Sequence, residues 1–420
     1  MNKLILIIIS VACFLFVKEE EKYELYNPSK EIIQQSKFKQ VEFGFNLGYL
    51  ARIKSSEVAL NKISSSGQFK YIRIYEPFGR TLYNNFDDIY SKINQITSKG
   101  FTLLISLSDY PYESEVKSDI NEKYEYEGLN DEAIEKIYRY SNRYPPADLN
   151  KYKVYLNKFL SGLQNKNLLD KVYFEIGNEP DSKKYFWGTP EQFEEIRNET
   201  VKILNQYNTK IICCGYTASL LTSTPDDRRK KYIESIKRKN SINHPPLSFH
   251  IYFNSNNQNR DFDTITSTYI KNGTITEYGI FSKITDQTVN KNKIYNSSEY
   301  MYWFGKLLNF TYKNDILRVF LWKLADDPSQ KGMPGYFDGK GYEKENYRYL
   351  NIALDVIKDG YYVETDDSKL KITGKNKTIL IALKPIELDN IQSSTYSEVA
   401  KIQNKSIRLT EKNWIIYNNK

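Results

Sequence analysis

The sequence predicts an α/β fold, a closed (β/α)8 (TIM) barrel followed by a small C-terminal all-β appendage. Between residues 41 and 357, short apolar runs rich in β-branched and aromatic residues alternate with longer segments of helical pattern. This alternation favours parallel strands joined by helical crossovers. Eight such runs occur and no Gly-x-Gly-x-x-Gly turn follows the first, so a closed barrel fits better than an open doubly wound sheet.

The individual elements can be placed along the chain. The predicted strands are, in order, residues 41–47, 69–75, 101–107, 171–176, 210–215, 247–252, 273–277 and 316–321. The crossover after the fourth strand has a readable start, because Thr189 can cap a helix that begins at Pro190 and is closed by Gln192 in a capping box. After residue 360 the runs become short and alternate with turn signals, which predicts the all-β appendage.

Composition and charge exclude several classes of function. The chain has 420 residues, of which 40% are hydrophobic and 27% charged, as is ordinary for a globular protein. The net charge of +8 does not predict a nucleic-acid partner, because the basic clusters 228–231 and 237–239 flank Ile233 and Ile236 as one solvated helix face would. With only two histidines and no acidic Ca²⁺ loop, we expect neither a metal nor a cofactor.

The N-terminus has the pattern of an export signal. Three residues with one lysine precede an apolar run over residues 4–17, which is short for a membrane span. We expect residues 1–17 to be a signal peptide or membrane anchor, with cleavage and lipidation at Cys13 both left open. An exported location follows, whether secreted or attached to the cell envelope. The expected layout continues with a linker over 18–40, the barrel over 41–358 and the β domain over 359–420.

The remaining two cysteines, Cys213 and Cys214, are adjacent in the fifth predicted strand. Vicinal cysteines rarely form a structural bridge. We therefore expect both to be buried strand residues without a disulfide.

Two glutamates stand at predicted strand ends, where barrels of this type carry their chemistry. Glu179 follows the fourth strand in Asn178-Glu179-Pro180, and Glu277 ends the seventh. Cleavage of a glycosidic bond needs two carboxyl groups, one to protonate the leaving oxygen and one to attack the anomeric carbon or activate water. A separation of about 5 Å between them would indicate retention of configuration.

These motifs resemble glycoside hydrolase clan A, in which the fourth strand ends in Asn-Glu-Pro and the seventh in a nucleophilic Glu. His250 and Tyr252 are similar to the sixth-strand His and Tyr of the clan, and Trp322 to its eighth-strand Trp. The segment 186–193 resembles the stretch that follows Asn-Glu-Pro in family 39, the xylosidase and iduronidase group. The resemblance runs through most of the barrel and implies a retaining enzyme.

The resemblance implies a role for each carboxylate. Glu277 would be the nucleophile, held ionised by hydrogen bonds from Tyr252 and from Arg73, unless Arg73 only pairs with Glu175 inside the barrel. The negative charge of Glu277 would raise the pKa of Glu179 and keep it protonated as the acid/base.

Four further residues are expected to bind substrate. Asn178 would bind the sugar 2-hydroxyl, and His250 would line the site instead of being a core histidine. Trp322 and Trp187 would offer apolar platforms for sugar rings.

The predicted function is therefore a retaining glycoside hydrolase that cleaves O-glycosidic bonds of oligo- or polysaccharides by double displacement. Its partner would be a carbohydrate substrate. The alternative is a non-catalytic carbohydrate-binding or adhesion protein of the cell envelope. That alternative predicts a degraded catalytic pair, whereas Glu179 and Glu277 are both present.

Overall fold

The structure is a computed structural model of the chain. It describes residues 38–77, 86–109, 145–146, 148–183, 185–221, 226–238, 245–254, 270–281, 297–326, 335–388, 402–403 and 406–419. The chain divides into two units, Met1–Phe38 and Lys39–Lys420, and the elements below all belong to the second.

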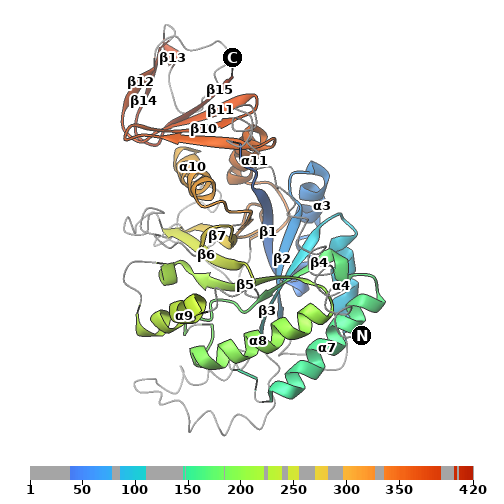
Figure 1. The fold of residues 1–420 in the computed structure, drawn as a ribbon. Helices are drawn as coiled ribbons and strands as arrows, with labels where there is room; N and C mark the ends of the chain where they lie inside the picture. Colours follow the sequence, from blue (N-terminus) through green and yellow to red (C-terminus); the bar gives the residue numbers. More distant parts are fainter. Residues whose placement is uncertain are drawn as a thin grey trace, which may run out of the picture. The chain divides into compact units, whose positions relative to one another are not determined.

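A closed barrel of parallel strands forms the centre of this unit (Figure 1). Each strand pairs with the next in the sequence, and the last pairs with the first. The (β/α)8 prediction is therefore confirmed, and each of the eight predicted strands is present. The barrel strands are β1 (Glu42–Tyr49), β2 (Tyr71–Pro77), β3 (Thr102–Asp109), β4 (Val172–Ile176), β5 (Lys210–Thr217), β6 (Leu247–Asn254), β7 (Thr274–Phe281) and β8 (Arg318–Leu321).

Amphipathic helices connect the strands and bury one face against them. In α8 the buried side chains include Phe193, Ile196 and Leu204, at the three- and four-residue spacing of a helix face. The predicted start of this helix is confirmed, because the Thr189 side chain accepts from the Gln192 amide in a capping box. The helices are α3 (Glu57–Ser66), α4 (Asp87–Thr97), α7 (Leu149–Asn165), α8 (Pro190–Gln206), α9 (Asp227–Arg238), α10 (Ser297–Lys313) and α11 (Glu345–Ile357).

The described residues also include three short 3-10 helices. They are η1 (Leu50–Arg52), η3 (Leu169–Lys171) and η4 (Ala218–Leu221). The first of them follows β1 directly, at the end of the barrel that carries the candidate site.

The C-terminal part consists of two small antiparallel sheets, which confirms the predicted all-β appendage. Strands in the order β15-β11-β10-β9 form the first sheet, and β12-β14-β13 form the second. The first sheet contacts α10 and α11 through residues such as Leu370 and Ile372. The strands are β9 (Tyr361–Thr365), β10 (Lys369–Gly374), β11 (Lys377–Ala382), β12 (Ile386–Leu388), β13 (Ile402–Gln403), β14 (Ser406–Leu409) and β15 (Trp414–Asn418).

The apolar run 4–17 and most of the predicted linker 18–40 lie outside the described residues. The signal or anchor and the domain limits therefore stay predictions. Among the helices that the structure describes, none is both long and apolar enough to cross a membrane.

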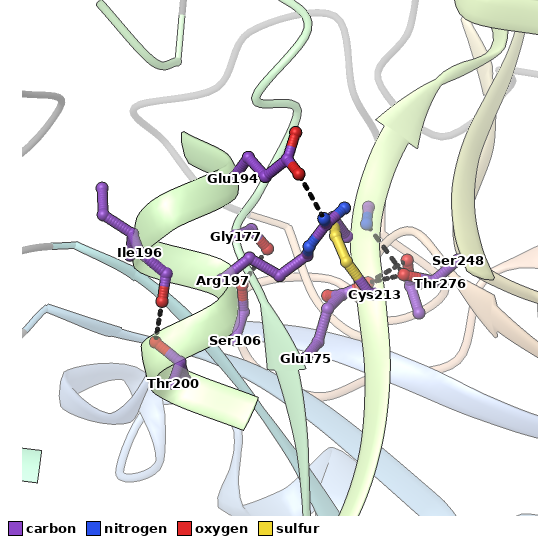
Figure 2. Close-up of a disulfide and its surroundings, with 12 residues drawn as sticks. Ser106, Glu175, Gly177, Glu194, Ile196, Arg197, Thr200, Cys213, Ser248 and Thr276 are labelled. Atoms are coloured by element: carbon purple, nitrogen blue, oxygen red, sulfur yellow. Dashed lines mark hydrogen bonds and ion pairs between the residues drawn. A yellow bond between two sulfur atoms is a disulfide. The ribbon is translucent and has the colours of Figure 1, made fainter. Parts of the chain in front are cut away.

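The adjacent cysteines depart from their prediction. Cys213 and Cys214 are fully buried in β5, as expected, but they are joined in a disulfide (Figure 2). The prediction assumed a regular strand, in which successive side chains point to opposite faces. In the structure the register of β5 against β6 shifts between Cys213 and Tyr216, so the strand is not regular there.

The close pairing of β1 with β2 offers a stability test. A Cβ atom added at Gly44 would lie 2.6 Å from the Tyr71 carbonyl oxygen, a backbone atom that cannot move alone. We expect Gly44→Ala to lower the free energy of unfolding by about 1–3 kcal/mol, as overpacking typically does. Gly339→Ala is the control, because a Cβ atom there meets nothing within 4 Å. Thermal melting of both variants checks this, and equal melting temperatures would contradict it.

Candidate active site

The two candidate carboxylates meet at one end of the barrel. Glu179 follows β4 and Glu277 lies within β7. An oxygen of Glu179, a ring nitrogen of His250 and an oxygen of Glu277 all lie within 4.8 Å of one another. The Glu277 side chain is 4% exposed and that of Glu179 12%. The sequence therefore predicted correctly that these carboxylates come together.

The chain turns sharply to present Glu179. Gly177 has φ 85° and Glu179 has φ 48°, in the left-handed region that non-glycine residues seldom adopt. The Gly177 amide donates to the Leu107 carbonyl at 3.1 Å, and the Glu179 amide donates to the Gly215 carbonyl at 2.9 Å. Bonds to β3 and β5 thus hold an unfavourable backbone conformation, of a kind that clusters at functional sites.

Arg73 of β2 connects the site residues through a single buried guanidinium. It donates to Glu175 at 2.7 Å and to Glu277 at 2.6 Å. It also donates to the side-chain oxygens of Asn46 and Asn178, each at 2.9 Å. Arg73 therefore pairs with Glu175 and also binds Glu277, so the alternative that it only pairs with Glu175 is wrong. Its planar fork lets one cation serve four acceptors.

Glu175 pairs with Arg73 beneath the site. Its side chain is fully buried, and it accepts from Ser248 Oγ at 2.6 Å and Thr276 Oγ1 at 2.7 Å (Figure 2). The Gly215 amide in turn donates to Ser248 Oγ at 2.8 Å. Pairing and hydrogen bonding of this kind offset the cost of burying a polar side chain.

Glu277 receives donors on both oxygens. Arg73 and the Tyr75 hydroxyl donate to Oε1, and the Tyr252 hydroxyl donates to Oε2. The expected bonds from Tyr252 and Arg73 are therefore present. Burial raises the pKa of Glu277 to about 7, against the opposing charge and hydrogen bond of Arg73. Glu277 therefore titrates near neutral pH instead of being ionised throughout the usual range.

The contacts of His250 define its tautomer. A guanidinium can only donate, so the Arg73 contact at 3.4 Å makes Nε2 the acceptor and leaves the proton on Nδ1. Nδ1 then donates to Glu179 Oε1 at 2.9 Å. Burial, with the Arg73 charge, lowers the pKa of His250 well below its usual value. A neutral imidazole thus orients Glu179.

The other predicted substrate residues lie at the same end of the barrel or in the loop that leaves it. The side-chain oxygen of Asn178 accepts a hydrogen bond from Arg73. The NH2 group of Asn178 can still act as a donor. The Trp322 ring stands edge-on to Tyr75 and Tyr252, with centroid distances of 6.0 and 6.4 Å. Trp187 is half-buried in the loop before α8 and stays a predicted substrate residue.

Sequence reasoning missed Tyr75 and Asn46. Tyr75 lies two residues after Arg73 on β2, so the period of two along a strand could have placed both on the same face. Asn46 binds Arg73 and also donates to the Thr276 carbonyl at 2.9 Å, which links β1 to β7. A lone Asn inside a strand gives no comparable signal.

One group in the described part of the chain has metal-ligand spacing, namely Glu179, His250 and Glu277. Two features disfavour a cation there. Arg73 already places a positive charge against Glu277, and the tautomer of His250 directs a proton, not a lone pair, toward Glu179. The arrangement is better suited to proton transfer and nucleophilic attack.

Comparisons with known proteins give a shared fold. No protein-family model and no curated protein matches the sequence. A solved glucosidase from Croceicoccus marinus is 13% identical, with 84% of this chain and 76% of that one covered and a TM-score of 0.52. An endo-1,4-beta-xylanase from Penicillium canescens is 11% identical, with 78% and 98% covered and a TM-score of 0.49. The first of these likenesses shows that the chain shares its fold with that glucosidase.

Proposed function

We propose that this protein is a retaining glycoside hydrolase, with Glu277 as nucleophile and Glu179 as acid/base. One observation carries the proposal: oxygens of the two carboxylates lie within 4.8 Å at the strand ends of the barrel. Retaining enzymes hold their carboxyl groups about 5–5.5 Å apart, whereas inverting enzymes need about 6.5–9.5 Å to admit a water. The fold shared with a glucosidase also supports it.

In the first step Glu277 attacks the anomeric carbon while Glu179 gives its proton to the leaving oxygen. The glycosidic bond breaks and a glycosyl ester forms on Glu277. The bond from His250 to Oε1 of Glu179 would hold this carboxyl group in position for the proton transfer. The amide group of Asn178 would bind the sugar 2-hydroxyl, a contact that strengthens in the transition state.

In the second step water cleaves the ester. Glu179, now ionised, takes a proton from the water as its oxygen attacks the anomeric carbon, and Glu277 leaves as a carboxylate. Arg73, Tyr75 and Tyr252 each donate to Glu277, and these bonds favour its ionised form as a leaving group. Two displacements restore the original anomeric configuration.

The substrate class is an oligo- or polysaccharide joined by O-glycosidic bonds. The segment 186–193 supports a relation to family 39 within clan A, and Trp322 and Trp187 would be platforms for sugar rings. The apolar run 4–17 supports export, either secreted or attached to the envelope.

Alanine variants of the two glutamates should lose activity in different ways. On an aryl glycoside with a good leaving group, we expect Glu277→Ala to lose more than about 10³-fold in kcat, because no ester can form. Azide added to this variant should restore turnover and give the glycosyl azide of inverted configuration. Glu179→Ala should accumulate the ester, because the activated leaving group needs no proton, and azide should then give the retained azide.

The control is Glu343→Gln. It removes the charge of a half-exposed glutamate that pairs with Lys62 at the surface. It should keep wild-type activity. Wild-type turnover by Glu277→Ala would contradict the mechanism. Glycan binding without turnover by the wild-type protein would favour the non-catalytic alternative.

The pKa of Glu277 predicts the acidic limb of the pH profile. A nucleophile works only when ionised, and burial raises this pKa to about 7. We therefore expect kcat/KM to fall about tenfold per pH unit as the pH drops below about 7. Steady-state assays from pH 5 to 8 check this, with circular dichroism at each pH to exclude unfolding. A kcat/KM that stays constant down to pH 5 would be incompatible with this role.

A further inference from the structure

An irregularity in β1 turns Tyr49 toward the site. Asn46 pairs with Arg73, but the register then shifts, so that Gly48 pairs with Ile74 and Tyr49 with Tyr75. In an unshifted register, residue 48 would stand opposite Tyr75. The extra residue forms a bulge, a device that re-aims side chains beside active sites. Gly48 has φ 85°, which glycine adopts without strain.

The bulge extends a row of aromatic rings outward from the carboxylates. The Trp322 ring lies 6.0 Å from that of Tyr75, and the Tyr75 ring lies 5.6 Å from that of Tyr49, between centroids. Trp322 and Tyr75 are both only partly accessible, whereas Tyr49 is 39% exposed. Each step is comparable to the width of one pyranose ring. Arg52 lies over the ring of Tyr49, with its guanidinium carbon 5.7 Å from the ring centroid.

The hydrogen bonds of Glu277 show on which side of the scissile bond Tyr49 lies. Tyr75 and Arg73 donate to Oε1, whereas Oε2 faces His250, which binds Glu179. The row of rings that runs from Tyr75 to Tyr49 therefore begins on the side of Glu277 that points away from the acid/base. Because the acid/base protonates the leaving group, the opposite side holds the glycone, the part of the substrate that becomes bonded to the nucleophile.

We propose that Tyr49, assisted by Arg52, binds a second sugar residue on the glycone side, so that the enzyme cleaves chains at least two residues from their non-reducing end. This inference rests on the proposed function and adds a mode of action to it. An exposed aromatic ring offers an apolar face to the C–H groups of a pyranose, and a guanidinium beside it donates to hydroxyl groups. Binding energy from such a remote sugar can be used at the reacting bond.

The test compares matched 4-nitrophenyl β-glycosides with one and two sugar residues: glucoside and cellobioside, xyloside and xylobioside, mannoside and mannobioside. For the series that the enzyme hydrolyses, we expect the disaccharide to exceed the monosaccharide in kcat/KM by about tenfold or more. Tyr49→Ala should bring this ratio of kcat/KM values close to one, by lowering only kcat/KM for the disaccharide glycoside. Tyr49→Phe should keep the ratio, because the ring remains.

A control variant, Tyr342→Ala, removes a different tyrosine that is 66% exposed and should leave both values unchanged. Thermal melting of each variant shows that it is folded. Equal kcat/KM for the one- and two-residue glycosides in the wild type would overturn the subsite, as would an equal loss on both in Tyr49→Ala. Hydrolysis of the one-residue glycosides alone would contradict only this inference.

Discussion

The site depends on one buried cation, the guanidinium of Arg73, which has no exposed side-chain surface. A charge in such a place costs several kcal/mol unless it is paired and hydrogen-bonded. Glu175 and Glu277 supply the pairing, and Asn46 and Asn178 accept the remaining hydrogen bonds. Arg73 itself lies on β2, and its partners come from β1, β7 and the end of β4. The same contacts that satisfy the cation therefore also bring the strand ends of the site together.

This arrangement gives the two proposed catalytic carboxylates different surroundings. Glu277 is buried among donors, and its pKa of about 7 results from burial working against Arg73, a cation that it shares with Glu175. Glu179 is more exposed and lies against a neutral imidazole, where a proton can reach a leaving group or water. Pairs of titratable groups with environments this different are typical of acid/base and nucleophile assignments.

Much of the fold could be predicted from the sequence, because each barrel strand is a short apolar run between helical segments. Glu179 and Glu277 could be predicted as well, since both end such runs. Tyr75 was missed although it shares a strand face with Arg73. The position of Tyr49 could not have been predicted, because it depends on a register shift in β1. A glycine within a strand does not by itself indicate that a bulge forms there.

The disulfide of β5 was missed for a similar reason, since a regular strand separates adjacent side chains and the register of β5 against β6 shifts between Cys213 and Tyr216. In each case the sequence specifies the element, while tertiary contacts decide its local geometry.

The most direct test of the central claim is the stereochemistry of the first product. Proton NMR can follow the anomeric signals of the released sugar in the first minutes of hydrolysis of an aryl glycoside, before mutarotation mixes them. A retaining pair at Glu179 and Glu277 predicts that the first-formed sugar has the same anomeric configuration as the substrate. Initial release of the opposite anomer would contradict it, because a single displacement by water would then be the mechanism.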